Sequence, residues 1–277
     1  MKMPIPIPPG SESVTVEPLA YIVAGTGPPL LLIHGAFANG QSSWNIQLKT
    51  LPEHHRLLVV DRRGHGASPR EPRPYTIAGD ATDVLKVADL AATATFHLVG
   101  HSYGGLVAIE IARRAPQRIR SLHLIEPPYL SLLAGEPDVG ALTRQSQVIF
   151  QHARAWAPER IAAAFFELIL GPDGLAELQT HQSWCDIVRE ASRGADEEFT
   201  GAYSPGALDD LRLGAPVRVY TGTRSHPVHQ KIARRLAESI RGAHLVEVPE
   251  ATYAVQRCVE PFHQVLIAVT IAEPGTR

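Results

Sequence analysis

Short runs of apolar residues recur along the chain, and stretches with helical periodicity lie between them. Runs rich in Val, Leu and Ile are typical of strands that are buried on both faces of a parallel sheet. The stretches between them carry apolar residues at spacings of three and four, as amphipathic helices do. This alternation predicts an α/β fold with right-handed crossovers and a mostly parallel central sheet flanked by helices. The predicted strands are Ser13–Glu17, Leu19–Val23, Leu30–Ile33, Arg56–Asp61, Thr95–Gly100, Ser121–Glu126 and Val217–Thr221, and the predicted helices are Trp44–Leu51, Ile77–Ala92, Gly105–Ala115 and Gln230–Ile240.

One region breaks the alternation, because its pattern is helical throughout. Helices are predicted at Leu142–Ala155, Glu159–Leu170 and Leu175–Glu190. We expect this region to form a helical lid, inserted after the sixth strand, over the carboxyl ends of the strands, where open α/β sheets bind ligands. The chain then divides into a core domain, residues 1–128 and 215–277, and a lid, residues 129–214.

The composition is that of a globular protein with enough apolar material for a large core. Hydrophobic residues make up 44% of the 277 residues and charged residues 19%, and the formal net charge is −2. A chain so close to neutral has no bulk electrostatic attraction for nucleic acid or anionic lipid. Because no apolar run approaches the ~20 residues that a bilayer requires, we expect neither nucleic acid nor a membrane as a partner.

The two cysteines, Cys185 and Cys258, lie far apart and form no CxxC unit. The proline-rich start lacks the apolar segment of a secretory signal. We therefore expect a protein of the reducing cytoplasm. We expect it to be a monomer or a homodimer.

The segment Gly100-His-Ser-Tyr-Gly104-Gly105 follows a predicted strand and opens a predicted helix. It matches the G-x-S-x-G nucleophile elbow in the strand–turn–helix context that the motif requires. A sharp turn of this kind strains the backbone of the serine and excludes bulky neighbours. It also lifts the Ser102 hydroxyl above the sheet, at the positive end of the following helix.

Three further segments agree in order and spacing with one family. His34-Gly35-Ala36-Phe37 resembles its HG-x loop, Asp61 to Ser68 its D-x-R-G-x-G-x-S loop, and Val246–Pro249 with Glu260-Pro261-Phe262 its last strand and helix. On these motifs the chain resembles the α/β-hydrolase superfamily. The resemblance implies an α/β-hydrolase fold, an oxyanion hole made by the backbone N–H groups of Ala36 and Tyr103, and no cofactor.

A serine hydroxyl needs a base to take its proton and a carboxylate to orient that base. The family commonly keeps the acid after the strand Val217–Thr221, but Ser225 stands at that place here. Zearalenone-lactonase-like members resemble this chain in having a glutamate before a proline pair after the sixth strand. Glu126 is therefore the candidate acid, although it could also be a capping residue at a strand end.

At the position of the family's histidine, the sequence Pro249-Glu-Ala-Thr-Tyr253 places a tyrosine. A phenol with a pKa near 10 cannot replace a histidine as base at neutral pH, but it can donate a hydrogen bond to an oxyanion. Tyr253 is therefore expected beside the elbow as a donor. His226, next to the vacated acid position, is a candidate substitute base. His101 is expected to point away from the cleft.

Some aromatic and polar residues are candidates for substrate binding, although aromatic residues at helical spacing more often only pack. We expect His181 and Trp184 to share a helix face, since they lie one turn apart. The histidines lack the spacing of a metal site, so no metal is expected. The candidate substrate-binding residues are Phe37, His181, Trp184 and Tyr203.

Three functions remain open. The first is a serine hydrolase acting on an apolar, carbonyl-containing small molecule, such as an ester or lactone. The second is a non-hydrolytic cyclase, lyase or isomerase in which Ser102 and Tyr253 polarise a carbonyl. The third is a pseudoenzyme that binds a ligand without changing it, because a fold alone does not determine function.

Overall fold

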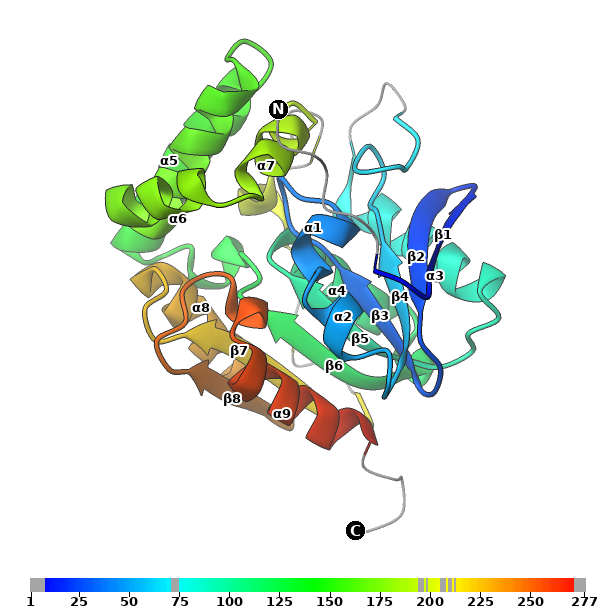
Figure 1. The fold of residues 1–277 in the computed structure, drawn as a ribbon. Coiled ribbons are helices and arrows are strands. Elements are labelled where there is room, and N and C mark those ends of the chain that lie inside the picture. Colours follow the sequence, from blue (N-terminus) through cyan, green and yellow to red (C-terminus); the bar gives the residue numbers. More distant parts are fainter. Residues whose placement is uncertain are drawn as a thin grey trace.

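The computed structural model describes residues 8–70, 75–193, 197, 199–204, 208, 211 and 213–271. Its centre is an eight-stranded sheet of order β1-β2-β4-β3-β5-β6-β7-β8 (Figure 1). β1 and β2 pair antiparallel, as do β2 and β4, and all the other neighbours are parallel. The predicted α/β fold with a mostly parallel sheet is therefore confirmed. The strands are β1 Ser11–Val16, β2 Leu19–Ala24, β3 Pro29–Ile33, β4 Arg56–Val60, β5 Phe96–His101, β6 Ile119–Ile125, β7 Val217–Gly222 and β8 Ala243–Val248.

Helices cover both faces of the sheet. One core cluster packs α3, Ile77–Leu90, α4, Tyr103–Arg114, and α8, Pro227–Ser239, against one face. A second cluster packs α1, Gly40–Trp44, α2, Gln47–Thr50, and α9, Val259–Ile271, against the other. The central strands are buried on both sides because each face has its own helical layer, which explains their continuous apolar sequences.

The first predicted helix, Trp44–Leu51, is wrong in its bounds. α1 begins before Trp44, because a capping box at Asn39 starts the helix there. The Asn39 side chain accepts a hydrogen bond from Ser42 N, and Ser42 Oγ pairs with the Asn39 backbone. A bend at Asn45 then separates α1 from α2. The last strand also begins earlier than expected, at Ala243.

Between β6 and β7 the described residues include the α-helices α5 Pro137–His152, α6 Pro158–Thr180 and α7 Trp184–Ala191. They gather above one end of the sheet (Figure 1) and have a small apolar core of their own. A predicted helix over Leu175–Glu190 is wrong, because the chain leaves the helical conformation between α6 and α7. Gly171, with φ of 74°, kinks α6 just before Pro172. The division into a core domain and a lid stays a prediction.

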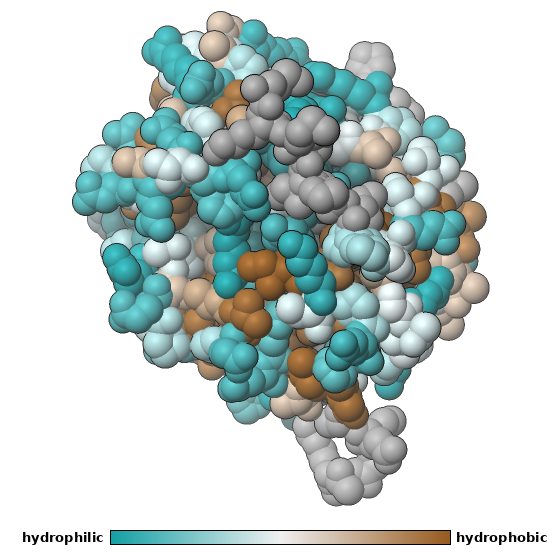
Figure 2. Space-filling model, viewed as in Figure 1, coloured by the Kyte–Doolittle hydropathy of each residue, from teal (hydrophilic) through white to brown (hydrophobic). Residues whose placement is uncertain are grey.

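The face seen in Figure 2 is mostly hydrophilic, with small brown hydrophobic patches near its middle. Among the described residues, the large hydrophobic side chains that are exposed are Leu90, Val148 and Ile271, which are scattered along the chain. None of the described helices is both long enough and apolar enough to cross a membrane.

Candidate active site

Ser102 occupies the sharp turn between β5 and α4. Its φ of 54° and ψ of −124° are strained for a residue with a side chain. A Cβ atom at Gly100 would lie 2.2 Å from the carbonyl oxygen of Gly104, and one at Gly104 would lie 2.5 Å from backbone oxygens of β3 and its loop. The glycines of the motif are therefore needed so that the backbone segments can approach each other closely. The turn is held by Ser102 N, which donates to the Ile125 carbonyl at 2.8 Å.

Two cavities meet at this serine. The smaller, about 30 Å³, is mainly apolar and is lined by residues such as Phe150, Phe165 and His229. The larger, about 750 Å³, has a mixed polar and apolar wall beneath the second half of α6. Ser102 and Tyr253 line both cavities, as do Ala36 and Ile169. The Ser102 side chain therefore borders both cavities.

The Tyr253 side chain lies beside the elbow. Its hydroxyl donates a short hydrogen bond to Ser102 Oγ, and its ring is buried. Burial raises the pKa of the Tyr253 phenol above its ordinary value, and the nearby Glu126 charge raises it further, although the bond to Ser102 opposes this. The phenol therefore stays protonated near neutral pH and acts as a hydrogen-bond donor, not as a base.

Glu126 lies just after β6, with a positive φ of 42°. Its Oε1 atom accepts hydrogen bonds from Thr221 Oγ1 at 2.8 Å and from Gly222 N at 2.9 Å. Burial raises the pKa of this carboxyl, while the hydrogen bonds around it oppose the rise. Its second oxygen, Oε2, lies 3.7 Å from Nδ1 of His229.

His229, which the sequence analysis did not single out, completes the cluster. It lies in the first turn of α8, and its buried ring stands nearly perpendicular to that of Tyr253, with 5.1 Å between the centroids. Burial lowers the pKa of His229 to about 3, helped by His226 and His101. Its position in the sequence was the signal that could have pointed to His229. The residue lies in α8, which starts directly after the loop that follows β7, where the family commonly keeps its acid.

Two other histidines lie differently from expectation. His226 is the N-cap of α8, where its Nδ1 accepts a hydrogen bond from Val228 N at 3.2 Å, and it lines neither cavity. The structure therefore does not bring this candidate base to Ser102. His101 lines the larger cavity and does not point away from it, because its Nε2 is held by the Tyr253 carbonyl at 3.1 Å.

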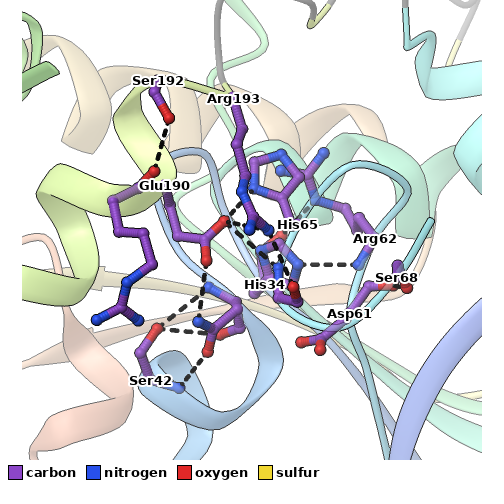
Figure 3. A network of polar contacts seen from close by, with 12 residues as sticks. His34, Ser42, Asp61, Arg62, His65, Ser68, Glu190, Ser192 and Arg193 are labelled. Atoms are coloured by element: carbon purple, nitrogen blue, oxygen red, sulfur yellow. Dashed lines mark hydrogen bonds and ion pairs between the residues drawn. The ribbon is translucent and has the colours of Figure 1, made fainter. Parts of the chain in front are cut away.

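The residues expected to form the oxyanion hole, Ala36 and Tyr103, line the smaller cavity next to Ser102. The loop that carries Ala36 is braced from behind by Arg62, whose guanidinium donates to the carbonyls of His34 and Gly35, both at 3.1 Å. His34 also accepts from the Arg62 backbone N at 3.0 Å (Figure 3). His34 thus supports the position of this loop.

A buried polar network ties this loop to α7. His65 lies 3.3 Å from Glu190 Oε2 (Figure 3). On its other side it lies 2.9 Å from Glu197 Oε1, and Glu190 also accepts from Asn39 Nδ2. Burial and the Arg62 charge oppose protonation of His65, yet the two carboxylates raise its pKa above the ordinary value. The network therefore fixes the loop of Ala36 against both the sheet and α7.

The four candidate substrate-binding residues divide into two pairs. Phe37 and His181 line the larger cavity. Trp184 does not line either cavity, because it packs in the apolar core of α5–α7, and it starts α7 whereas His181 ends α6. The structure does not bring Tyr203 to the cavities either. Its ring packs against Tyr129, and its hydroxyl donates to Glu110 at 3.2 Å.

Within the described part of the chain, no group of three or more His, Cys, Asp or Glu residues is arranged to hold a metal ion. The side chains that surround Ser102 bring hydroxyl, imidazole and carboxylate groups to the site.

Residues 28–251 match the family model of the α/β hydrolase fold. The chain therefore belongs to the α/β hydrolase fold family, as its motifs indicated.

Among its relatives is a protein of Variovorax paradoxus assigned as carbamate hydrolase RutD, 30% identical over 86% of this chain and 90% of that protein. The match to a RutD protein of Azorhizobium caulinodans is 31% identical but covers 52% of this chain and 58% of the relative. A solved hydrolase of Pseudomonas aeruginosa has a TM-score of 0.72 and 26% identity, covering 97% of this chain and 99% of its own. An enol-lactonase of Burkholderia xenovorans, 24% identical with a TM-score of 0.67 over 95% of this chain and 100% of its own, shares the fold.

Proposed function

We propose that this enzyme hydrolyses esters or lactones of small molecules, with Ser102 as nucleophile. The observation that carries the proposal is the position of Ser102, at a strained elbow where two cavities meet. The relative from Variovorax paradoxus supports it, because a carbamate, like an ester, has a carbonyl bonded to a heteroatom leaving group. The near-neutral, partly apolar walls favour an organic substrate over a polyanion.

In this proposal the base is His229. At neutral pH its imidazole is unprotonated, and it lines the same small cavity as the serine. Its Nδ1 and Oε2 of Glu126 are buried and have no hydrogen-bond partner among the described residues, although they face each other at 3.7 Å. Buried polar atoms are rarely left unpaired, and catalytic hydrogen bonds often tighten only in the reacting complex. Glu126 is the residue that would stabilise the imidazolium.

These positions support one proton sequence. His229 takes the Ser102 proton as Oγ attacks the carbonyl carbon, and the new oxyanion is held by the N–H groups of Ala36 and Tyr103. The imidazolium then returns the proton to the leaving oxygen, and water repeats the cycle to release the acid. Tyr253 donates to Oγ throughout, which lowers the nucleophilicity of the serine. We therefore expect slow turnover compared with an enzyme that has histidine at position 253.

A second candidate rests on the hydrogen bond from Tyr253 to Ser102. Two hydroxyls that face the same space could hold and polarise a substrate carbonyl without acylation, as a lyase, isomerase or cyclase requires. A pseudoenzyme would keep the cavities but perform no chemistry.

The test is labelling of the serine by a fluorophosphonate, with mass spectrometry of the peptide containing residue 102 and burst kinetics on 4-nitrophenyl butyrate. Hydrolysis predicts labelling and a burst, both lost in Ser102→Ala. Tyr253→Phe, which removes only a hydroxyl, should keep or raise the labelling rate. If Ser102 stays unlabelled and no burst occurs, acyl transfer is wrong. A carbonyl ligand that is then converted without acylation, and no longer in Tyr253→Phe, would establish the second candidate.

A further inference from the structure

Arg257 places a positive charge in the wall of the larger cavity. It ends the short 3-10 turn Val255–Arg257, before α9, and it shares this cavity with Ser102 and Tyr253. The side chain is half-buried. We propose that Arg257 binds a carboxylate group carried by the substrate, so that the natural substrate is a carboxylate-bearing ester or lactone. The reaction in this statement rests on the proposed function, whereas the anion site does not.

The guanidinium has no matching negative charge. Its Nη2 donates one long hydrogen bond, 3.5 Å, to Ser183 Oγ, and no carboxylate of the described residues lies within 4.0 Å of it. Burial lowers the pKa of Arg257, which reports a charge that is partly removed from water. A desolvated cation is costly unless it is paired, and arginine is well suited to hold a carboxylate through two parallel hydrogen bonds.

The neighbouring polar groups agree with an anion at this place. Ser183 presents both its backbone N and its hydroxyl to Nδ1 of His181, at 3.2 and 2.8 Å. Nδ1 of His181 is therefore a hydrogen-bond acceptor in these contacts. Ser183 and Arg257 both line the larger cavity, and the Arg257 guanidinium brings N–H donors to this part of its wall.

The carboxylates of the cavity lie elsewhere on its wall. Asp173, Glu177 and Glu250 also line it, and all three are exposed. Glu250 faces Arg224, with 3.9 Å between Oε2 and Nη1. These groups repel an anion from the rest of the wall, so the area around Arg257 is where a carboxylate is favoured.

The site and the elbow border the same cavity, so one ligand can reach both. The Arg257 charge is one of the influences that lower the pKa of His101, which adjoins Ser102 and lines the same cavity. A carboxylate on Arg257 and a scissile carbonyl on Ser102 can therefore be two ends of one short molecule. This changes the expected substrate from an apolar molecule to one with a charged end.

Binding is tested first, without chemistry, by isothermal titration of the enzyme with glutarate and with uncharged glutaramide. Glutarate should bind at least about tenfold more tightly than glutaramide. Arg257→Gln should remove that preference, and Arg257→Lys should keep part of it because the charge remains. The matched control is Arg224→Gln, which removes a second arginine of the same cavity and should change the affinity for glutarate less than twofold. Circular dichroism melting checks that each variant is folded.

Equal binding of glutarate and glutaramide by the unmodified enzyme would overturn the site without reference to any variant. An equal loss in Arg257→Gln and Arg224→Gln would also overturn it. The reaction is tested separately with 4-nitrophenyl hydrogen glutarate and its methyl ester. A lower KM for the acid, lost in Arg257→Gln, supports both proposals. If glutarate binds but neither ester is turned over, the anion site stands and the proposed hydrolysis is refuted. If the two esters are turned over equally, only the anion site is refuted.

Discussion

Oε2 of Glu126 and Nδ1 of His229 face each other at 3.7 Å, beside the Tyr253 ring. The two atoms come from the end of β6 and the first turn of α8, so the fold brings together a carboxylate and an imidazole that are far apart in sequence. Neither atom has a hydrogen-bond partner among the described residues. A shift of less than about 1 Å would create the acid–base pair that a serine nucleophile requires.

His229→Gln should lower kcat for 4-nitrophenyl butyrate by about 10²- to 10³-fold with little change in KM, because general-base assistance is lost while the cavity keeps its shape. The matched control is His226→Asn, three residues earlier. Asparagine can still cap α8, so this variant should keep kcat within about twofold. Similar losses in both variants would contradict the assignment of His229 as base.

The pH profile should lack an ordinary imidazole step. Since burial lowers the pKa of His229 to about 3, its basic form is present at neutral pH and is lost only as the pH falls toward 3. Glu126, His226, His101 and Tyr253 are the titratable groups around it. An acid limb at higher pH than the His229 step then belongs to Glu126, whose pKa is raised by burial, and should vanish in Glu126→Gln. A limb near pH 6.5 that persists in Glu126→Gln would contradict this.

Tyr253→His should raise kcat/KM for 4-nitrophenyl butyrate by at least about 10²-fold, because an imidazole at this place accepts the Ser102 proton where the phenol donates. The double variant Ser102→Ala, Tyr253→His is the control and should be inactive. No gain in the single variant would show that the remaining site, including Glu126, is not competent for acyl transfer.

The sequence predicted the features that depend on local spacing. Short motifs predicted the buried strands, the elbow around Ser102 and the position of Tyr253 beside this serine. The structure agrees with each of these predictions. His229 could not be predicted in this way, because its place beside Glu126 depends on how α8 packs on the sheet. Trp184 and Tyr203 do not line the cavities. Their positions could not be predicted, because a helical pattern does not show whether an aromatic side chain faces an apolar core or a cavity.

Stability should fall in mild acid because several histidines are buried in the neutral form. Burial lowers the pKa of His123 to about 3 and that of His97 to about 4, against about 6.5 in the unfolded chain. Between these values the unfolded state binds more protons, so this contribution is complete above pH 6.5 and is lost as the pH falls toward 4. Each such histidine adds a slope on the order of 1 kcal/mol per pH unit.

Urea unfolding at pH 7, 6 and 5 measures this slope. His123→Gln should reduce the slope by about one proton, while His54→Gln, at an exposed position, serves as the matched control. An unfolding free energy that stays constant from pH 7 to pH 5 would show that these histidines are not buried as neutral groups.

Arg62→Met should destabilise the fold by about 3–5 kcal/mol and also lower kcat. The guanidinium is fully buried, pairs with Asp80 at 3.1 Å and with Glu197, and donates to the carbonyls of the loop that carries Ala36. Its removal leaves the buried Asp80 carboxylate unpaired, leaves Glu197 with His65 alone, and frees the loop on which an oxyanion donor depends. The control is Arg234→Met, which breaks an exposed pair with Glu247 and should cost less than about 1 kcal/mol. Urea unfolding and 4-nitrophenyl butyrate kinetics on both variants separate the effects. A destabilised Arg62→Met enzyme whose folded fraction keeps full kcat would show that the buried arginine supports the fold but not the position of the oxyanion loop.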